Sequence, residues 1–172
     1  ASFGIAGYIN LKSTSLKPLL YGGTGSDSLN LDMPIDGPAR YESGSSNIVA
    51  ISGLNASIDW ISSQDIYTEE KELTDYMIEE LKKIRKVWLF LPENYQQIFG
   101  VVSFAVKDYS SDEVGKILND EYDICVRTGY HCAPLVHDFI GSKEYNGTVR
   151  VSLSYFSTRE EVDKTVDTIL AK

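Results

Sequence analysis

The sequence predicts an α/β protein of the α+β kind, in which helices cover one face of a mixed or antiparallel sheet. Three observations support this prediction. Apolar residues recur at three- and four-residue steps through residues 48–84, as on helices that bury one face. Residues 148–154 alternate between apolar and polar side chains, which is typical of a strand. From residue 87 onward, two strands, a helix, two strands and a helix follow one another.

The composition limits the classes of function that the chain can serve. Its 172 residues, 42% of them hydrophobic, can bury an ordinary core. The formal charge is −9 and no Lys and Arg cluster is interleaved with aromatic residues, so we expect no nucleic-acid partner. No stretch reaches the roughly 20 apolar residues of a membrane span, and we expect no signal peptide. Cys125 and Cys132 have neither a disulfide pattern nor a metal-binding spacing, so the expected compartment is a reducing cytoplasm.

The first part of the chain is predicted to consist of one strand-like run and a long loop. Residues 1–10, ASFGIAGYIN, are apolar and glycine-spaced, and they look cut from a longer chain. Residues 19–46 are rich in residues that permit turns and positive φ angles. A loop of this length in a compact domain is usually functional.

Two helices and two strands are predicted next. The apolar positions are Ile48, Ile51, Leu54, Ile58 and Ile61 in the first helix and Ile66, Leu73, Met77, Leu81 and Ile84 in the second, longer one. The apolar runs 87–91 and 98–106 are separated by the turn-prone PENY, which indicates neighbouring antiparallel strands.

Two capping boxes mark the start of the remaining helices. Ser110 precedes Glu113 by three residues, and Thr158 precedes Glu161 by three, each before an apolar stripe at helical spacing. We therefore expect a short helix after residue 110 and a closing helix after residue 158.

The strands between these helices place two residues of interest. The run ICVR, residues 124–127, is predicted to be a strand, with Cys125 as an inert thiol in the core. In the strand 148–154, Val149, Val151 and Leu153 share one face, so Arg150 is expected on the other.

The segment RTGYHCAP, residues 127–134, is the most informative part of the sequence. It places the thiol of Cys132 beside His131 and five residues after Arg127, and cationic neighbours favour the nucleophilic thiolate. Gly129 lets the loop approach a ligand closely. The alternative is a small buried cysteine, because free cysteine is among the most buried residue types.

Other candidate binding residues carry weaker signals. The guanidinium of Arg150 suits a carboxylate, although a surface salt bridge is the commoner fate of an isolated arginine. The loops GGTGSDS and RYESGSSN suit a phosphate, yet Ser45 and its neighbours also satisfy an ordinary helix N-cap. His137 is expected on a short helix, and the pattern identifies no partner for it.

Taken together and in this order, six segments resemble the C-terminal portion of class V aminotransferase-fold enzymes that use pyridoxal phosphate (PLP), in particular the cysteine desulfurase and selenocysteine lyase group. They are YGGTGSDS, MP, RYESGSSN, RTGYHCAP, GTVRVSLSYFST and the closing REEVD helix. The resemblance implies a fold type I PLP-dependent transferase. Residues 1–46 would be the end of the large PLP-binding domain with interface loops, and residues 47–172 the small C-terminal domain.

The resemblance also implies roles for individual residues. Cys132 would attack the sulfur of PLP-bound L-cysteine, or of a similar amino acid, and become a persulfide. Arg150 would bind the substrate carboxylate, with Arg127 and His131 completing the substrate site.

Across the interface of a homodimer, the resemblance implies contacts with the cofactor phosphate. Ser45, which stands where the family usually has Thr, would contact this phosphate together with Gly23 and Thr24 in the glycine-rich loop.

One essential group falls outside the chain. The family holds PLP covalently through the lysine of a His-Lys pair, which would lie just before Ala1, and the cofactor-stacking His and Asp also lie upstream. Lys12 and Lys17 lie beyond that motif. The polypeptide alone is therefore expected to be inactive, and the full-length protein to be a cysteine desulfurase that produces alanine and an enzyme persulfide.

Two alternatives remain open at the level of sequence. The first alternative to a cysteine desulfurase is another enzyme of this fold, such as a selenocysteine lyase, an aminotransferase or an epimerase. The second is a noncatalytic domain for dimerisation or interaction. The preference for sulfur over selenium and the identity of a sulfur-acceptor protein are not encoded in any motif that we recognise.

Overall fold

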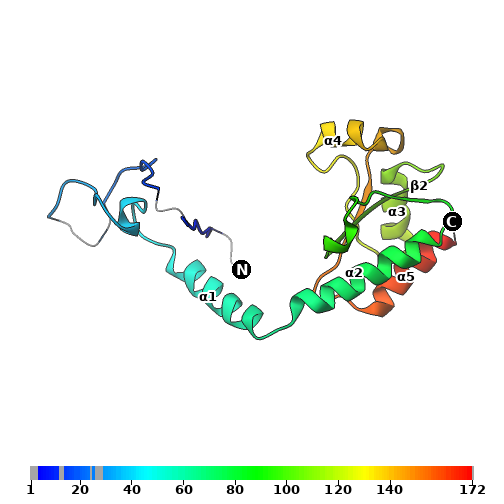
Figure 1. Cartoon of the computed structure of the whole chain (residues 1–172), viewed down its shortest axis with the longest axis horizontal. Coiled ribbons are helices and arrows are strands. Elements are labelled where there is room, and N and C mark those ends of the chain that lie inside the picture. Colours follow the sequence, from blue (N-terminus) through cyan, green and yellow to red (C-terminus); the bar gives the residue numbers. More distant parts are fainter. Residues whose placement is uncertain (1–3, 12–13, 24, 26–28, 172) are drawn as a thin grey trace. The chain divides into compact units, whose positions relative to one another are not determined.

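The computed structural model of the chain describes residues 4–11, 14–23, 25 and 29–171 (Figure 1). The chain divides into two compact units, residues 1–64 and residues 65–172. This division is one of compactness within the chain. The predicted boundary between residues 46 and 47 concerns the domains of a longer protein, and it stays a prediction.

The first unit is mostly loop and contains one long helix. A short 3-10 helix, Pro38–Arg40, precedes α1, Ile48–Ser62, whose first turn is capped by the side chain of Asn47 accepting from the backbone N–H of Ala50. The predicted first helix is thus confirmed. The strand-like run is wrong for its described residues, 4–10, which form no strand. A strand needs a neighbour to pair with, and the described part of this unit contains none.

The second unit is built on a three-stranded antiparallel sheet in the order β1-β2-β3. The strands are β1, Val87–Leu89, β2, Val101–Val106, and β3, Val149–Ser152. The predicted pairing of the first two strands is confirmed, with Trp88 opposite Ala105. Arg150 of β3 lies opposite Ser103 of β2.

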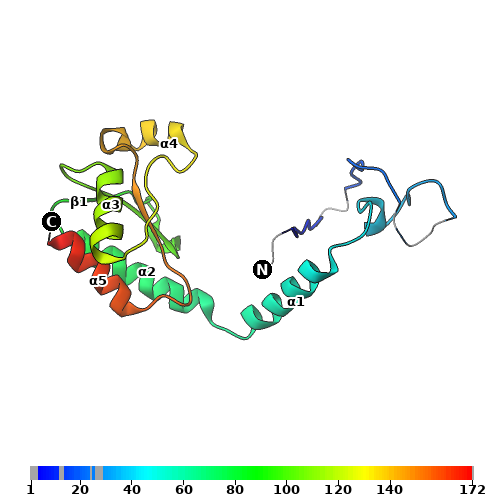
Figure 2. The same cartoon turned by 180° about the vertical axis from the view of Figure 1, so that it is seen from behind.

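Three helices follow their predicted positions and lie on one face of the sheet. They are α2, Ile66–Lys82, α3, Ser111–Tyr122, and α5, Arg159–Leu170. Both predicted capping boxes are present, at Ser110 and at Thr158. Figures 1 and 2 show α2 and α5 side by side along the sheet, where they are in contact.

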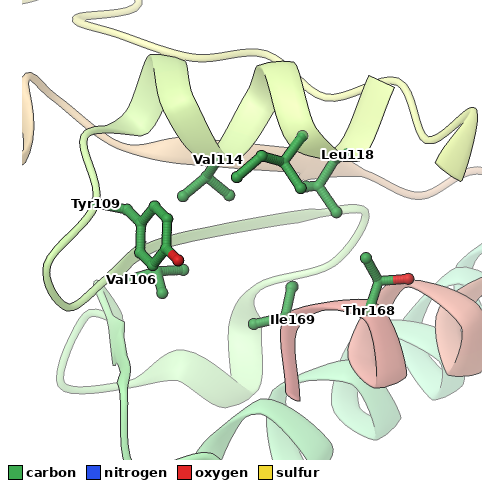
Figure 3. Close-up of a pocket in the computed structure, with 7 residues that line it drawn as sticks. Val106, Tyr109, Val114, Leu118, Thr168 and Ile169 are labelled. Carbon is green, nitrogen blue, oxygen red and sulfur yellow. The ribbon is translucent and has the colours of Figure 1, made fainter. Parts of the chain in front are cut away.

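The core lies between these helices and the sheet. Its fully buried members include Phe104 of β2, Met77 and Leu81 of α2, and Val149 of β3. Where α3 meets α5, Val114 and Leu118 point toward Ile169 around a small apolar pocket (Figure 3). Burial of these side chains holds the helices on this face and leaves the other face of the sheet for Arg150.

The region between α3 and β3 differs from the prediction in two respects. Residues 124–127 do not form a strand, because only Arg127 pairs with β3, through Arg150, while the preceding residues leave the sheet. Cys125 is exposed and does not lie in the core. Ile124 and Val126 pack against the core instead. The prediction of a buried Cys125 is therefore wrong, and its two neighbours in the sequence are the ones that reach the core.

Three short helices complete the second unit. Pro134–Phe139 forms α4, which confirms the short helix expected around His137, and Ser142–Tyr145 forms a 3-10 helix. A third 3-10 turn, Tyr95–Gln97, connects β1 to β2.

Candidate active site

The site is built around a turn that presents Cys132. The carbonyl oxygen of Tyr130 accepts from the backbone N–H of Ala133 at 2.8 Å, which closes the turn. The two central residues, His131 and Cys132, have φ angles of 50° and 61°. Positive φ at both centres is the mark of a type I′ turn, which usually contains Asn and Gly. Each residue with a side chain in this region costs about 1–2 kcal/mol, so the surroundings must hold the turn in place.

Backbone contacts with the start of β3 fix one end of this turn. The carbonyl oxygen of Gly129 accepts from the N–H of Thr148 at 3.1 Å. Gly147 packs so closely that a Cβ atom there would lie 2.2 Å from Gly129 O, so a side chain is excluded. The buried Ser111 hydroxyl accepts from Gly129 N–H at 3.2 Å and donates to the carbonyl of Asn146 at 2.8 Å. The first residue of α3 thus joins the turn to β3.

Arg127 lies next to the thiol of Cys132. Its Nη2 donates to Cys132 Sγ at 3.5 Å, and Cys132 is exposed. Two backbone hydrogen bonds with Arg150, of 3.0 and 2.7 Å, hold Arg127 at the sheet edge. The guanidinium therefore supplies a charged hydrogen-bond donor to the sulfur atom.

Arg150 projects from the sheet face that is opposite the core, as the alternation of β3 predicts. Its neighbours Val149 and Val151 are buried, while Arg150 itself is half-buried. Its Nε is buried and has no hydrogen-bond partner among the described residues. A buried donor without a partner is unusual in a folded protein, and a carboxylate is the ligand that a guanidinium fork fits best.

His131 is placed so that one ring nitrogen remains available. Nε2 lies 2.9 Å from the hydroxyl and 3.2 Å from the carbonyl oxygen of Thr148, whereas Nδ1 is buried without a partner in the described part of the chain. Burial lowers the pKa of His131 below its ordinary value, and the positive charges of Arg150 and Arg127 lower it further. The ring is therefore neutral at neutral pH.

Two of these side chains, Arg150 and His131, border one open hollow on the face of the sheet that is away from the core, whereas Arg127 and Cys132 are not among its lining residues. Arg150, His131, Thr148 and Ser103 supply its polar lining, and Trp88 is among its apolar lining residues. The apolar pocket of Figure 3 is lined by neither Arg150 nor His131. The hollow beside Arg150 is therefore the candidate site.

Sequence reasoning missed the role of His137 in this region. The side chain is 3% exposed, with Nδ1 2.7 Å from the hydroxyl of Ser142 and Nε2 3.0 Å from the carbonyl oxygen of Tyr130. No local pattern could have identified these partners, because the Cys132 turn brings Tyr130 back to α4. The five-residue spacing between His137 and Ser142 does not by itself predict a hydrogen bond between them.

The predicted cofactor residues lie in the first unit of the chain. The carbonyl oxygen of Gly23 accepts from Gly44 N–H at 2.7 Å, which joins the two loops, and Ser45 is exposed. A Cβ atom at Gly23 or Gly44 would meet nothing within 4 Å, so the backbone beside Ser45 is open to a ligand. An exposed hydroxyl beside open backbone fits a phosphate group. Thr24 lies outside the described residues.

The described residues contain no group of three His, Cys, Asp or Glu side chains that could hold a metal ion. None of the helices in this part of the chain is long and apolar enough to cross a membrane.

Known proteins resemble this chain over most of its length. The sequence model of the aminotransferase class-V family matches residues 6–165. A probable cysteine desulfurase of Methanothermobacter thermautotrophicus is 32% identical over 163 residues, which cover 90% of this chain and 39% of the relative. A cysteine desulfurase of Pectobacterium carotovorum is 34% identical over 134 residues, 76% of this chain and 31% of the relative. The chain thus spans well under half the length of these relatives.

Solved structures show the same relationship. The apo cysteine desulfurase of Thermococcus onnurineus matches 90% of this chain and 38% of its own, with 33% identity and a TM-score of 0.78. A cysteine desulfurase of Escherichia coli covers 89% of this chain, with a TM-score of 0.70 and 23% identity, and shows the fold alone. The predicted fold, part of a PLP-dependent transferase, is confirmed. The chain belongs to the aminotransferase class-V family and resembles its cysteine desulfurases.

Proposed function

We propose that this chain is the C-terminal part of a PLP-dependent cysteine desulfurase and that Cys132 accepts the sulfur. The observation that carries the proposal is the position of the exposed Cys132 thiol 3.5 Å from Arg127 Nη2, on a turn beside Arg150, whose buried Nε has no partner within the described residues. The names of the relatives support the same reaction.

Arg150 binds the substrate and Cys132 reacts with it. Arg150 binds the carboxylate of L-cysteine through its guanidinium fork, which fixes the substrate relative to the thiol. When bound, PLP supplies an electron sink at the substrate's α-carbon, and the lysine that holds it belongs to the family's upstream His-Lys pair.

Cys132 then removes the sulfur as a nucleophile. The Cys132 thiolate attacks the substrate sulfur, so that an S–S bond forms and the bond from sulfur to the substrate's β-carbon breaks. The electron pair of that bond remains with the substrate, whose carbon takes up a proton. The products are alanine and a persulfide on Cys132.

His131 and Arg127 support this step in different ways. Arg127 donates from Nη2 to Cys132 Sγ and holds the sulfur in position for the attack. His131 is neutral, and its Nε2 is occupied by Thr148, so Nδ1 is the atom that hydrogen bonds with the bound substrate. We assign both residues to the substrate site.

The first unit contributes to cofactor binding in the same proposal. Ser45 and Gly23 contact the cofactor phosphate of a second subunit in a homodimer, and Thr24, which lies outside the described residues, is assigned to the same contact. Both cysteines are free thiols, which fits a reducing cytoplasm. A sulfur-acceptor protein receives the persulfide sulfur from the exposed Cys132.

Two readings compete with this proposal. Another enzyme of the same fold, such as a selenocysteine lyase or an aminotransferase, would use Arg150 in the same way but would not need a persulfide on Cys132. A noncatalytic interaction domain would not need PLP, so the full-length protein would lack the cofactor's absorbance.

The test compares two single substitutions in the full-length protein. With a thiol reductant present, which releases the persulfide sulfur as sulfide, Cys132→Ala should abolish the production of alanine and sulfide from L-cysteine, whereas Cys125→Ala, which removes the other exposed thiol, should leave it intact. Continued sulfide release by Cys132→Ala would refute the assignment of the nucleophile.

A further inference from the structure

The turn that carries Cys132 lacks the residues that normally stabilise its backbone. His131 and Cys132 occupy the two central positions, both at positive φ, where Asn and Gly are usual. Contacts of Gly129 with Ser111 and Thr148 hold the turn on its N-terminal side. The C-terminal side leads directly into α4, whose N-cap, Ala133, has no side-chain hydrogen bond. Some other group must hold this side.

His137 is the group that reaches back from α4 to the turn. It is the one buried residue of that helix, and its Nε2 lies 3.0 Å from Tyr130 O. The same carbonyl oxygen closes the turn by accepting from Ala133 N–H at 2.8 Å. Tyr130 O therefore receives two donors from the residues that follow Cys132. The rings of His137 and Tyr130 also pack edge to face, with centroids 5.2 Å apart.

The contacts of His137 define its tautomer. A carbonyl oxygen can only accept, so Nε2 carries the proton and donates to Tyr130 O. Nδ1 lies 2.7 Å from the Ser142 hydroxyl, which can donate to it. Both nitrogens of the buried ring therefore have a partner, and the bond from Nε2 to Tyr130 O has a defined direction.

We propose that His137 is a positioning residue that holds the Cys132 turn, and with it the thiol, beside Arg127. The inference rests on the proposed function in that Cys132 is the reacting thiol. Without the bond from Nε2, only the Ala133 N–H would secure Tyr130 O, and the turn would open toward a less costly backbone conformation. The thiol would then leave the guanidinium that now lies 3.5 Å away.

A pair of amide substitutions separates the two bonds of His137. The side-chain NH2 of Gln in His137→Gln can take the place of Nε2 and donate to Tyr130 O. The shorter side chain in His137→Asn can reach only the Ser142 hydroxyl, through its carbonyl oxygen. Both variants remove the ring from the same buried position, and His137→Gln keeps the bond to Tyr130 whereas His137→Asn keeps the bond to Ser142.

Two measurements on the full chain report the result. The first is the rate at which iodoacetamide alkylates Cys132 relative to the exposed Cys125, and the second is the hydrogen exchange of the Ala133 amide. We expect His137→Asn to lower the rate ratio by about fivefold, the effect of one lost hydrogen bond, and to speed the exchange of Ala133. His137→Gln should keep both values close to those of the unchanged chain. Equal effects of the two substitutions would overturn the inference.

The tautomer gives a test that needs no variant. Nitrogen NMR of the unchanged chain should find the proton of His137 on Nε2, and a proton on Nδ1 alone would overturn the inference. These readouts do not involve PLP. If they behave as expected while the full-length protein releases no sulfur from cysteine, the positioning role stands and the proposed reaction fails.

Discussion

Replacing Gly147 by alanine tests whether the Cys132 loop is held against the start of β3. The φ angle of Gly147 is 100°, and a Cβ atom would lie 2.2 Å from the carbonyl oxygen and 2.3 Å from the carbonyl carbon of Gly129. Both are backbone atoms, which cannot rotate away as the end of a side chain can. Gly141 provides a matched control, because its φ is also positive, at 74°, while a Cβ there would meet nothing within 4 Å.

The difference between the two glycines gives the magnitude. Gly141→Ala carries the cost of a left-handed backbone, about 1–2 kcal/mol, which is partly offset by a lower entropy of the unfolded chain. Gly147→Ala carries a comparable backbone cost and also forces two backbone segments apart, and overpacking of this kind adds about 1–3 kcal/mol. We expect its loss of unfolding free energy to exceed that of Gly141→Ala by about 2 kcal/mol.

Urea unfolding and thiol alkylation measure the two consequences. Because Gly129 precedes the Cys132 turn, Gly147→Ala should also lower the alkylation rate of Cys132 relative to Cys125, and Gly141→Ala should not. Equal losses of stability in the two variants would refute the close contact with Gly129.

Two further predictions concern charge. Arg127→Gln should lower the alkylation rate of Cys132 relative to Cys125, because the positively charged donor that contacts Cys132 Sγ at 3.5 Å is removed, and Arg127→Lys should retain part of the effect; equal rates in all three proteins would contradict this. Hydrogen bonds from the backbone N–H and hydroxyl of Ser110 lower the pKa of Glu113 below its ordinary value. A carboxylate with a lowered pKa in the folded state stabilises the chain above its ordinary pKa, about 4.5, and loses this effect as the pH falls through the folded value. Glu113→Gln should therefore reduce the acid dependence of unfolding, and a pH profile like that of the unchanged chain would contradict the capping box.

The elements that the sequence predicted well depend on local signals. The capping boxes at Ser110 and Thr158 involve residues three apart in the chain, so their hydrogen bonds form wherever a helix begins. The side of β3 from which Arg150 projects follows from strict alternation. These signals require no knowledge of distant parts of the chain.

The errors arise where distant parts of the chain decide the result. ICVR has the composition of a strand, but only Arg127 finds a partner on β3, so Cys125 becomes exposed. The bond from His137 to Tyr130 exists only because two residues between them adopt positive φ, which no sequence pattern for His or Cys predicts. The candidate residues themselves were named from the sequence, while the groups that hold them in place were found only in the structure.

The location of the persulfide tests the central claim most directly. The full-length protein, incubated with L-cysteine, is alkylated, digested and analysed by mass spectrometry without reduction. The proposal predicts one additional sulfur atom on the peptide that contains Cys132 and none on the peptide that contains Cys125. Additional sulfur on the Cys125 peptide alone, or on neither peptide while alanine is produced, would contradict it.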